Sequence, residues 1–147
     1  FNYVYSYLIE NLFNGKRIIM GRSLGSASAF EITSKCSNKI DGCIIESGFA
    51  TEYPLLELMG LNYREINFNL SDGFDNLKKN KNYKGPIFVI HAEKDHIVPL
   101  EQGELIYSSS ISDNKKILVV ESANHNNIIY CIKDKYFENI RDFIISI

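Results

Sequence analysis

A serine between two glycines, in the run Gly21-Arg22-Ser23-Leu24-Gly25, is the first group in this sequence whose setting suggests chemistry. The short segment 17–20, apolar at residues 18–20, leads into it, and a run rich in small residues follows, as at a sharp turn from a strand into a helix. Such a turn holds the serine in a strained conformation, with the glycines leaving space and the hydroxyl raised above the sheet. The sequence therefore predicts that Ser23 is a nucleophile.

Asp95 and His125 can complete a proton-transfer system with such a serine. Asp95 comes shortly after the predicted strand 86–91, apolar at residues 86–90, and His125 shortly after the predicted strand 116–120, apolar at residues 117–120. An imidazole titrates near neutral pH and suits removal of a serine proton. A carboxylate can accept the other N–H of that imidazole, hold its tautomer and stabilise the imidazolium. Asp95 or His125 alone would be interpreted as an ordinary loop residue, so the prediction for these two rests on all three residues together.

Two other readings of the nearby polar residues stay open. Glu46 follows the apolar residues 43–45 and is an alternative acid to Asp95, whereas Glu93 and Asp72 are expected to be surface carboxylates. His91 is expected to pack in the core, and His96 to be exposed.

A metal site at residues 91–96 is not expected. The spacing of its histidines and carboxylates is not helical and matches no recognised zinc pattern. We therefore predict neither a metal ion nor a cofactor.

Short apolar runs alternate with helical patterns along the chain, which predicts a parallel sheet with helices on both faces. The predicted strands are 17–20, 43–45, 86–91 and 116–120. The predicted helices are 4–13, 24–35, 51–59, 75–79, 100–108 and 136–144. Ligands of such sheets bind beyond the carboxyl ends of the strands, where the serine, aspartate and histidine are all expected.

The helix at 51–59 is expected to begin at Thr51 as its N-cap and to stop at Gly60. Its apolar side chains are compatible with a lid or acyl-pocket wall and equally with plain core; they are Tyr53, Leu55, Leu56, Leu58 and Met59.

Composition excludes several other classes of protein. The chain has 147 residues and a net charge of −2, so it is one domain without the basic surface that nucleic acids require. No apolar run is long enough to span a membrane. The three cysteines, Cys36, Cys43 and Cys131, are an odd number without paired spacing, which favours a reducing, cytoplasmic compartment over a disulfide framework. As free cysteines they are expected to be small buried side chains.

The sequence resembles the α/β-hydrolase-fold serine hydrolases, especially small esterase- or thioesterase-like members. Gly21 to Gly25 look like the family's Gly-x-Ser-x-Gly elbow, and residues 91–99 are similar to its acid loop, a His-x-x-x-Asp followed by Val-Pro. Residues 123–126, Ala-Asn-His-Asn, look like its histidine loop, and residues 44–50 are similar to the segment after the elbow. The chain order serine, acid, histidine is also that of the family.

This resemblance implies a role for each residue. Ser23 would be the nucleophile, His125 the base and then the acid, and Asp95 the orienting carboxylate. The backbone N–H of Leu24 would donate one hydrogen bond to the oxyanion. Residues 1–147 would be a partial domain, the C-terminal half of the fold, because the family's earlier strands and its second oxyanion loop have no counterpart here.

The expected function is hydrolysis of a carboxylic ester or thioester through an acyl-enzyme at Ser23. The substrate would be a small molecule or a lipid-acyl ester. The alternative is a non-catalytic binding module on the same fold. The strand from Arg17 to Met20 is expected to be a sheet edge that self-associates or pairs with a missing N-terminal segment, and the chain alone to be poorly active. A cytoplasmic location is expected and is compatible with peripheral membrane association.

Overall fold

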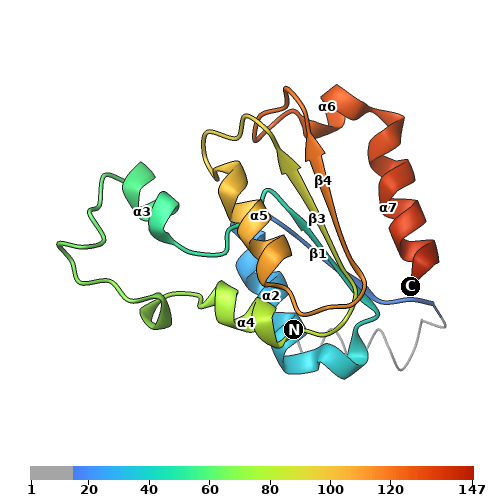
Figure 1. Cartoon of the computed structure of the whole chain (residues 1–147), viewed down its shortest axis with the longest axis horizontal. Coiled ribbons are helices and arrows are strands. Elements are labelled where there is room, and N and C mark those ends of the chain that lie inside the picture. Colours follow the sequence, from blue (N-terminus) through green and yellow to red (C-terminus); the bar gives the residue numbers. More distant parts are fainter. Residues whose placement is uncertain (1–14) are drawn as a thin grey trace.

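Four parallel strands form one sheet in the order β1-β2-β3-β4 (Figure 1). The computed structural model describes residues 15–147, so the helix predicted at 4–13 lies outside the described residues. The strands are β1 (Ile18–Arg22), β2 (Gly42–Glu46), β3 (Ile87–Ala92) and β4 (Lys115–Val120). The predicted fold class is confirmed, with each strand displaced from its predicted bounds by two residues or fewer.

The two central strands are buried along their whole length, which explains why they are continuous apolar runs. Side chains alternate between the two faces of the sheet. Ile45 and Val89 pack into the core on one face, and Ile44 and Phe88 into the core on the other.

Helices cover both faces of the sheet (Figure 1). Residues of α2, α4 and α5 belong to the core with Ile45, and residues of α6 and α7 to the core with Ile44. The elements are α2 (Gly25–Cys36), η1 (Ser37–Lys39), α4 (Asn76–Asn82), α5 (Leu100–Ser109), α6 (Ile128–Ile132) and α7 (Asp134–Ser146).

The closing helix α7 lies along one side of the sheet and follows directly on α6 (Figure 1). It buries Tyr136 and Phe143, and the ring centroid of Phe143 lies 5.5 Å from that of Phe88 in β3. The predicted amphipathic helix is therefore confirmed. The helix α6 was not predicted, because five consecutive apolar residues are too few to show a helical period.

Residues 51–75 form an arm beside the sheet that contains α3 (Tyr53–Leu58) and η2 (Leu70–Asp72) (Figure 1). The Thr51 N-cap was wrong: the helix begins after Glu52, and the N–H and hydroxyl of Thr51 both donate to Oε1 of Gln102. The predicted stop is confirmed, since Gly60 follows the helix with a φ of +74° that favours glycine.

The interpretation of the apolar side chains of residues 53–59 as plain core was wrong for Leu58 and Met59, whereas Leu55 is partly buried against the core residues Phe49 and Val98. No residue of α3 is buried, and Leu58 and the following Met59 are 59% and 72% exposed. The arm is closed at its base by the buried Glu52, whose carboxylate accepts a hydrogen bond from the backbone N–H of Phe74.

Within the described residues β1 pairs only with β2, so it is an edge of the sheet, as expected. Met20 on this strand is 46% exposed. An edge strand presents backbone groups that can pair with further strand.

The cysteines differ in their surroundings. Cys43 in β2 is buried, but Cys131 in α6 is exposed and Cys36 is half-buried, so the expectation of three buried thiols was wrong. It failed because sequence alone did not place Cys131 on the outer side of its helix. None of the helices within residues 15–147 has the length and apolar character needed to cross a bilayer.

Candidate active site

Ser23 lies in the turn between β1 and α2. Its φ of +51° is in the left-handed region, which costs a non-glycine residue about 1–2 kcal/mol. Two backbone hydrogen bonds hold this conformation: the N–H of Ser23 donates to the carbonyl of Glu46 at 2.9 Å, and its carbonyl accepts from Ser26. The strained serine expected from the motif is therefore present at the carboxyl end of β1.

The two glycines of the motif are not equivalent. A Cβ on Gly21 would lie 2.6 Å from the carbonyl oxygen of Gly25 and 2.7 Å from the Cβ of Ala29. A Cβ on Gly25 would have no described atom within 4 Å. Of the two glycines of the motif, Gly21 is the one that clears space, by letting β1 approach α2 closely.

A chain of hydrogen bonds joins Asp95, His125 and Ser23. The Nδ1 of His125 lies 2.7 Å from Oδ2 of Asp95, and Nε2 lies 3.0 Å from Oγ of Ser23. Because a carboxylate only accepts, Nδ1–H donates to it. The neutral ring then accepts the hydroxyl proton of Ser23 at Nε2, the geometry needed for general-base removal of that proton.

The carboxylate of Asp95 is buried and accepts further hydrogen bonds. The N–H groups of Val98 and Ile97 donate to Oδ1 at 2.8 and 3.0 Å. Burial opposes ionisation of Asp95, but these donors and the His125 imidazole outweigh it and hold the pKa of this carboxyl below its ordinary value. Asp95 thus stays a charged acceptor at neutral pH.

His91 is fully buried and supports the acid loop, as expected for a core histidine. Its Nε2 lies 2.8 Å from the carbonyl of Val98, to which it must donate, and its Nδ1 has no partner. Burial lowers the pKa of His91, so the ring is neutral. A Cβ on Gly103 would lie 2.4 Å from Nδ1, so this glycine of α5 makes room for the ring.

The loops after β3 and β4 are joined to each other. The N–H of Lys94 donates to the carbonyl of Ala123 at 2.8 Å. The exposed Glu93 accepts a hydrogen bond from the N–H of Ser122 at 2.7 Å. These bonds fix the loop that carries Asp95 against the loop that carries His125.

Glu46 contacts other groups than the imidazole of His125. Its Oε1 accepts from Nε of Arg22 at 3.0 Å, and its Oε2 accepts from the hydroxyl of Tyr136. Burial and this carboxylate raise the pKa of Tyr136, which remains a phenol that donates. The acid beside the imidazole is Asp95, so the open alternative of Glu46 in that position was wrong.

No family model matches the sequence. The chain is 36% identical over 152 residues to an uncharacterized membrane protein of Saccharomyces cerevisiae, YNL320W, covering 97% of this chain and 51% of the yeast protein. The structure is similar to the Pyrococcus furiosus esterase Pf2001, with a TM-score of 0.75, 18% identity, and coverage of 96% of this chain and 58% of that one. It is also similar to the monoacylglycerol lipase of Paleococcus ferrophilus, with a TM-score of 0.70, 16% identity, and coverage of 98% and 73%.

The chain has an α/β-hydrolase fold.

The chain spans about half the length of the curated relatives it matches, 51%, 47% and 52% of three of them. Structures of the α/β-hydrolase fold place the nucleophile on an elbow between a strand and a helix. Ser23 occupies that place here, between β1 and α2.

The N–H of Leu24 lies in the first turn of α2, where backbone N–H groups lack intrahelical acceptors. This position suits the donor expected in an α/β-hydrolase elbow. The Leu24 side chain is 61% exposed.

A cavity of about 230 Å³ adjoins His125. Its lining combines the polar groups behind the histidine with the apolar start of α6: Arg22, Glu46, His125, Asn126, Ile128, Ile129 and Tyr130. This cavity lies beside His125, the candidate base.

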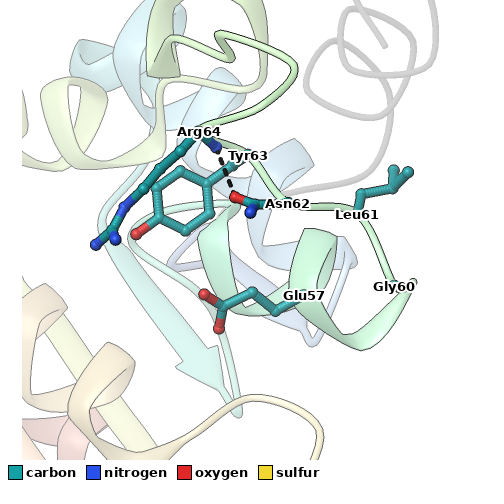
Figure 2. A pocket seen from close by; sticks show the side chains of 6 residues that line it. All are labelled: Glu57, Gly60, Leu61, Asn62, Tyr63 and Arg64. Carbon is teal, nitrogen blue, oxygen red and sulfur yellow. Dashed lines mark hydrogen bonds between the residues drawn. The ribbon is translucent and has the colours of Figure 1, made fainter.

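A larger hollow of about 450 Å³ lies in the arm (Figure 2). It is lined by Glu57, Gly60, Leu61, Asn62, Tyr63 and Arg64. The hydrogen bond drawn in Figure 2 joins the N–H of Arg64 to Oδ1 of Asn62 and is local to the arm. None of Ser23, Asp95 and His125 lines this hollow, whereas His125 lines the smaller cavity, so we place the candidate site beside the smaller cavity.

Most of the predicted residues lie where the α/β-hydrolase motif placed them. His96 is exposed, as expected, and so are Glu93 and Asp72. Sequence reasoning missed Arg22 and Tyr136. Arg22 had a signal, because a charged residue at the end of a strand and next to Ser23 requires a partner, whereas Tyr136 was indistinguishable from a core residue.

Proposed function

We propose that this chain carries the nucleophile, base and acid of a serine hydrolase that cleaves carboxylic esters or thioesters. The supporting observation is the hydrogen-bonded order Asp95–His125–Ser23, with Nε2 of the imidazole 3.0 Å from the serine hydroxyl. The esterase and lipase among the similar structures favour the same reaction.

In the proposed reaction, Oγ of Ser23 attacks the acyl carbonyl while its proton passes to Nε2 of His125. The carboxylate of Asp95 stabilises the resulting imidazolium. The N–H of Leu24 donates to the oxyanion of the tetrahedral intermediate. His125 then returns the proton to the leaving alcohol or thiol, and an acyl-enzyme remains.

Water attacks the acyl-enzyme in the second half of the reaction. His125 again accepts a proton, and collapse of the second intermediate releases the acid and restores the serine hydroxyl. The second oxyanion donor is proposed to come from residues outside the described part, since the relatives are about twice as long as this chain. The same residues would pair with the edge of β1.

A lipid-acyl ester is the substrate class to test first. The apolar side chains of Ile128 and Ile129 line the cavity beside His125, and Leu24, which follows Ser23 in the chain, is exposed. The monoacylglycerol lipase of Paleococcus ferrophilus has a similar structure. Aliphatic esters of glycerol and of p-nitrophenol with short and long acyl chains would separate this class from small esters.

Labelling with a fluorophosphonate probe tests the proposal on the full-length protein. The probe adduct is expected on Ser23, and Ser23→Ala is expected to lose both labelling and ester hydrolysis with an unchanged circular dichroism spectrum. Ser28→Ala is the matched control, because Ser28 is an exposed serine of α2, the helix that follows Ser23. Equal labelling of the Ser23→Ala variant would exclude Ser23 as nucleophile and favour a binding module.

A further inference from the structure

Arg22 connects the nucleophile and the base through the main chain. It directly precedes Ser23 at the end of β1. Its Nη2 donates to the backbone carbonyl of His125 at 2.5 Å and lies 3.3 Å from Oδ1 of Asn126. The guanidinium thus contacts residues 125 and 126 of the loop that carries the imidazole, and these bonds do not involve the imidazole ring.

Glu46 holds the guanidinium in this position. Its side chain is only 5% exposed, and it accepts from Nε of Arg22 at 3.0 Å while the hydroxyl of Tyr136 in α7 donates to its second oxygen. A buried carboxylate needs such partners, because an unpaired charge in the interior is strongly destabilising. Glu46 also faces Arg22 directly across the β1–β2 pair.

The imidazole of His125 therefore has two anchors. Asp95, after β3, holds the ring at Nδ1, and Arg22, on β1, holds the backbone carbonyl. Because Arg22 and Ser23 are consecutive, a shift of the end of β1 moves the nucleophile and the second anchor together. The distance between Oγ of Ser23 and Nε2 of His125 therefore depends on the position of the backbone at residues 22 and 23.

We infer that Arg22, held by Glu46, is a positioning residue that sets the His125 loop relative to Ser23. This inference rests on the function proposed above. Misplacement of a catalytic group by about 1 Å can lower the rate about 100-fold. Loss of Arg22 should thus lower kcat without weakening substrate binding.

The test compares Arg22→Ala with Arg17→Ala in the full-length protein, using p-nitrophenyl butyrate. Arg17 is a matched control at the other end of the same strand, where its Nε donates to Asp41 at 3.2 Å. We expect Arg22→Ala to lower kcat by about 10- to 100-fold with KM within about twofold. Arg17→Ala should leave both constants within about twofold of the parent.

Guanidinium ion supplies a second measurement that a general loss of stability would not reproduce. Added at millimolar, non-denaturing concentration, it should restore part of the kcat of Arg22→Ala by occupying the space beside Glu46. It should restore nothing to Ser23→Ala. Arg22→Lys should recover only part of the rate, because an ammonium group lacks the forked donors that reach Glu46 and His125 together.

Three outcomes would overturn the inference. A raised KM with unchanged kcat would make Arg22 a substrate-binding residue of the adjoining cavity. Equal kinetics of Arg22→Ala and Arg17→Ala would make it an ordinary ion pair, as would a variant that guanidinium does not rescue. If Arg22→Ala does not fold, the pair Arg22→Ala/Glu46→Gln removes the stranded charge and must show the same loss of kcat. An active Ser23→Ala variant would instead contradict the proposed function itself.

Discussion

The hydroxyl of Ser23 lies 3.0 Å from Nε2 of His125, although the two residues are 102 positions apart and follow opposite edge strands of the described sheet. Neighbouring strands lie about 4.8 Å apart, so the ends of β1 and β4 are separated by roughly three such spacings. The loop after β4 must therefore fold back over the ends of β3 and β2. Its bonds to Lys94 and Arg22 are the contacts that keep it there.

Asp95→Asn should lower kcat by about 10⁴-fold with little change in fold. The Asn oxygen would keep accepting from Val98 and Ile97, which turns the amide nitrogen toward Nδ1 of His125. The imidazole would then carry its proton on Nε2 and could not accept one from Ser23. Steady-state kinetics of the full-length protein measure the loss. A rate within tenfold of the parent would remove Asp95 from the proposed mechanism.

Gly21→Ala and Gly25→Ala should differ in stability. The first places a methyl 2.6 Å from a backbone oxygen that cannot move away, and is expected to cost about 1–3 kcal/mol of the free energy of unfolding. The second meets open space at the start of α2 and should be neutral or gain up to about 1 kcal/mol. Urea unfolding measures both. Equal destabilisation would show that the close approach of β1 to α2 is not what Gly21 provides.

The free energy of unfolding should fall as pH drops below 6.5, because of His91. Its folded-state pKa lies below its ordinary value of 6.5, so under that pH the unfolded chain binds the proton first. The slope contributed by one such group is at most about 1.4 kcal/mol per pH unit. The carboxyls whose pKa is lowered, Glu31, Asp41 and Asp95, have ordinary values of 4.5 or 3.8 and lose their contribution only at lower pH.

His91→Gln separates this contribution from the others. The amide can still donate to the carbonyl of Val98 but does not titrate, so the slope between pH 6.5 and 4.5 should flatten. His96→Gln is the matched control, since His96 is exposed, and should leave the slope unchanged. Thermal unfolding at a series of pH values measures both variants, and an unchanged slope in His91→Gln would contradict the prediction.

The cysteines should react at different rates with a thiol reagent such as DTNB. Cys131 is exposed and should react in the native protein. Cys43 is fully buried, and burial raises the pKa of its thiol to about 12, so it should react only after unfolding. Cys131→Ser should remove the fast phase. A fast phase that persists in this variant would mean that Cys43 or Cys36 is reachable.

Local sequence determined the strands, most helices and the elbow. Residues 87–90 are apolar without interruption, which in a short segment bounded by Pro86 predicts a buried strand, and β3 is such a strand. The Gly-x-Ser pattern at residues 21–23 indicated the turn. Gly21 is required there because only a residue without a Cβ allows the close approach of β1 to α2. The positions of Asp95 and His125 after strands follow from the parallel order of a sheet.

Tertiary structure alone decided which charges meet. Glu46 ends β2 and Asp95 follows β3; the resemblance of residues 91–99 favoured Asp95 as the acid, but nothing in the segment around Glu46 predicts its pairing with Arg22. The choice depends on how far the loop after β4 folds back, which the Asn-rich sequence of that loop does not specify. Likewise, the exposure of Met59 and Cys131 could not be predicted from the sequence. The spacing of apolar residues predicts a helix, but whether a side chain is buried depends on residues distant in the sequence that pack against it.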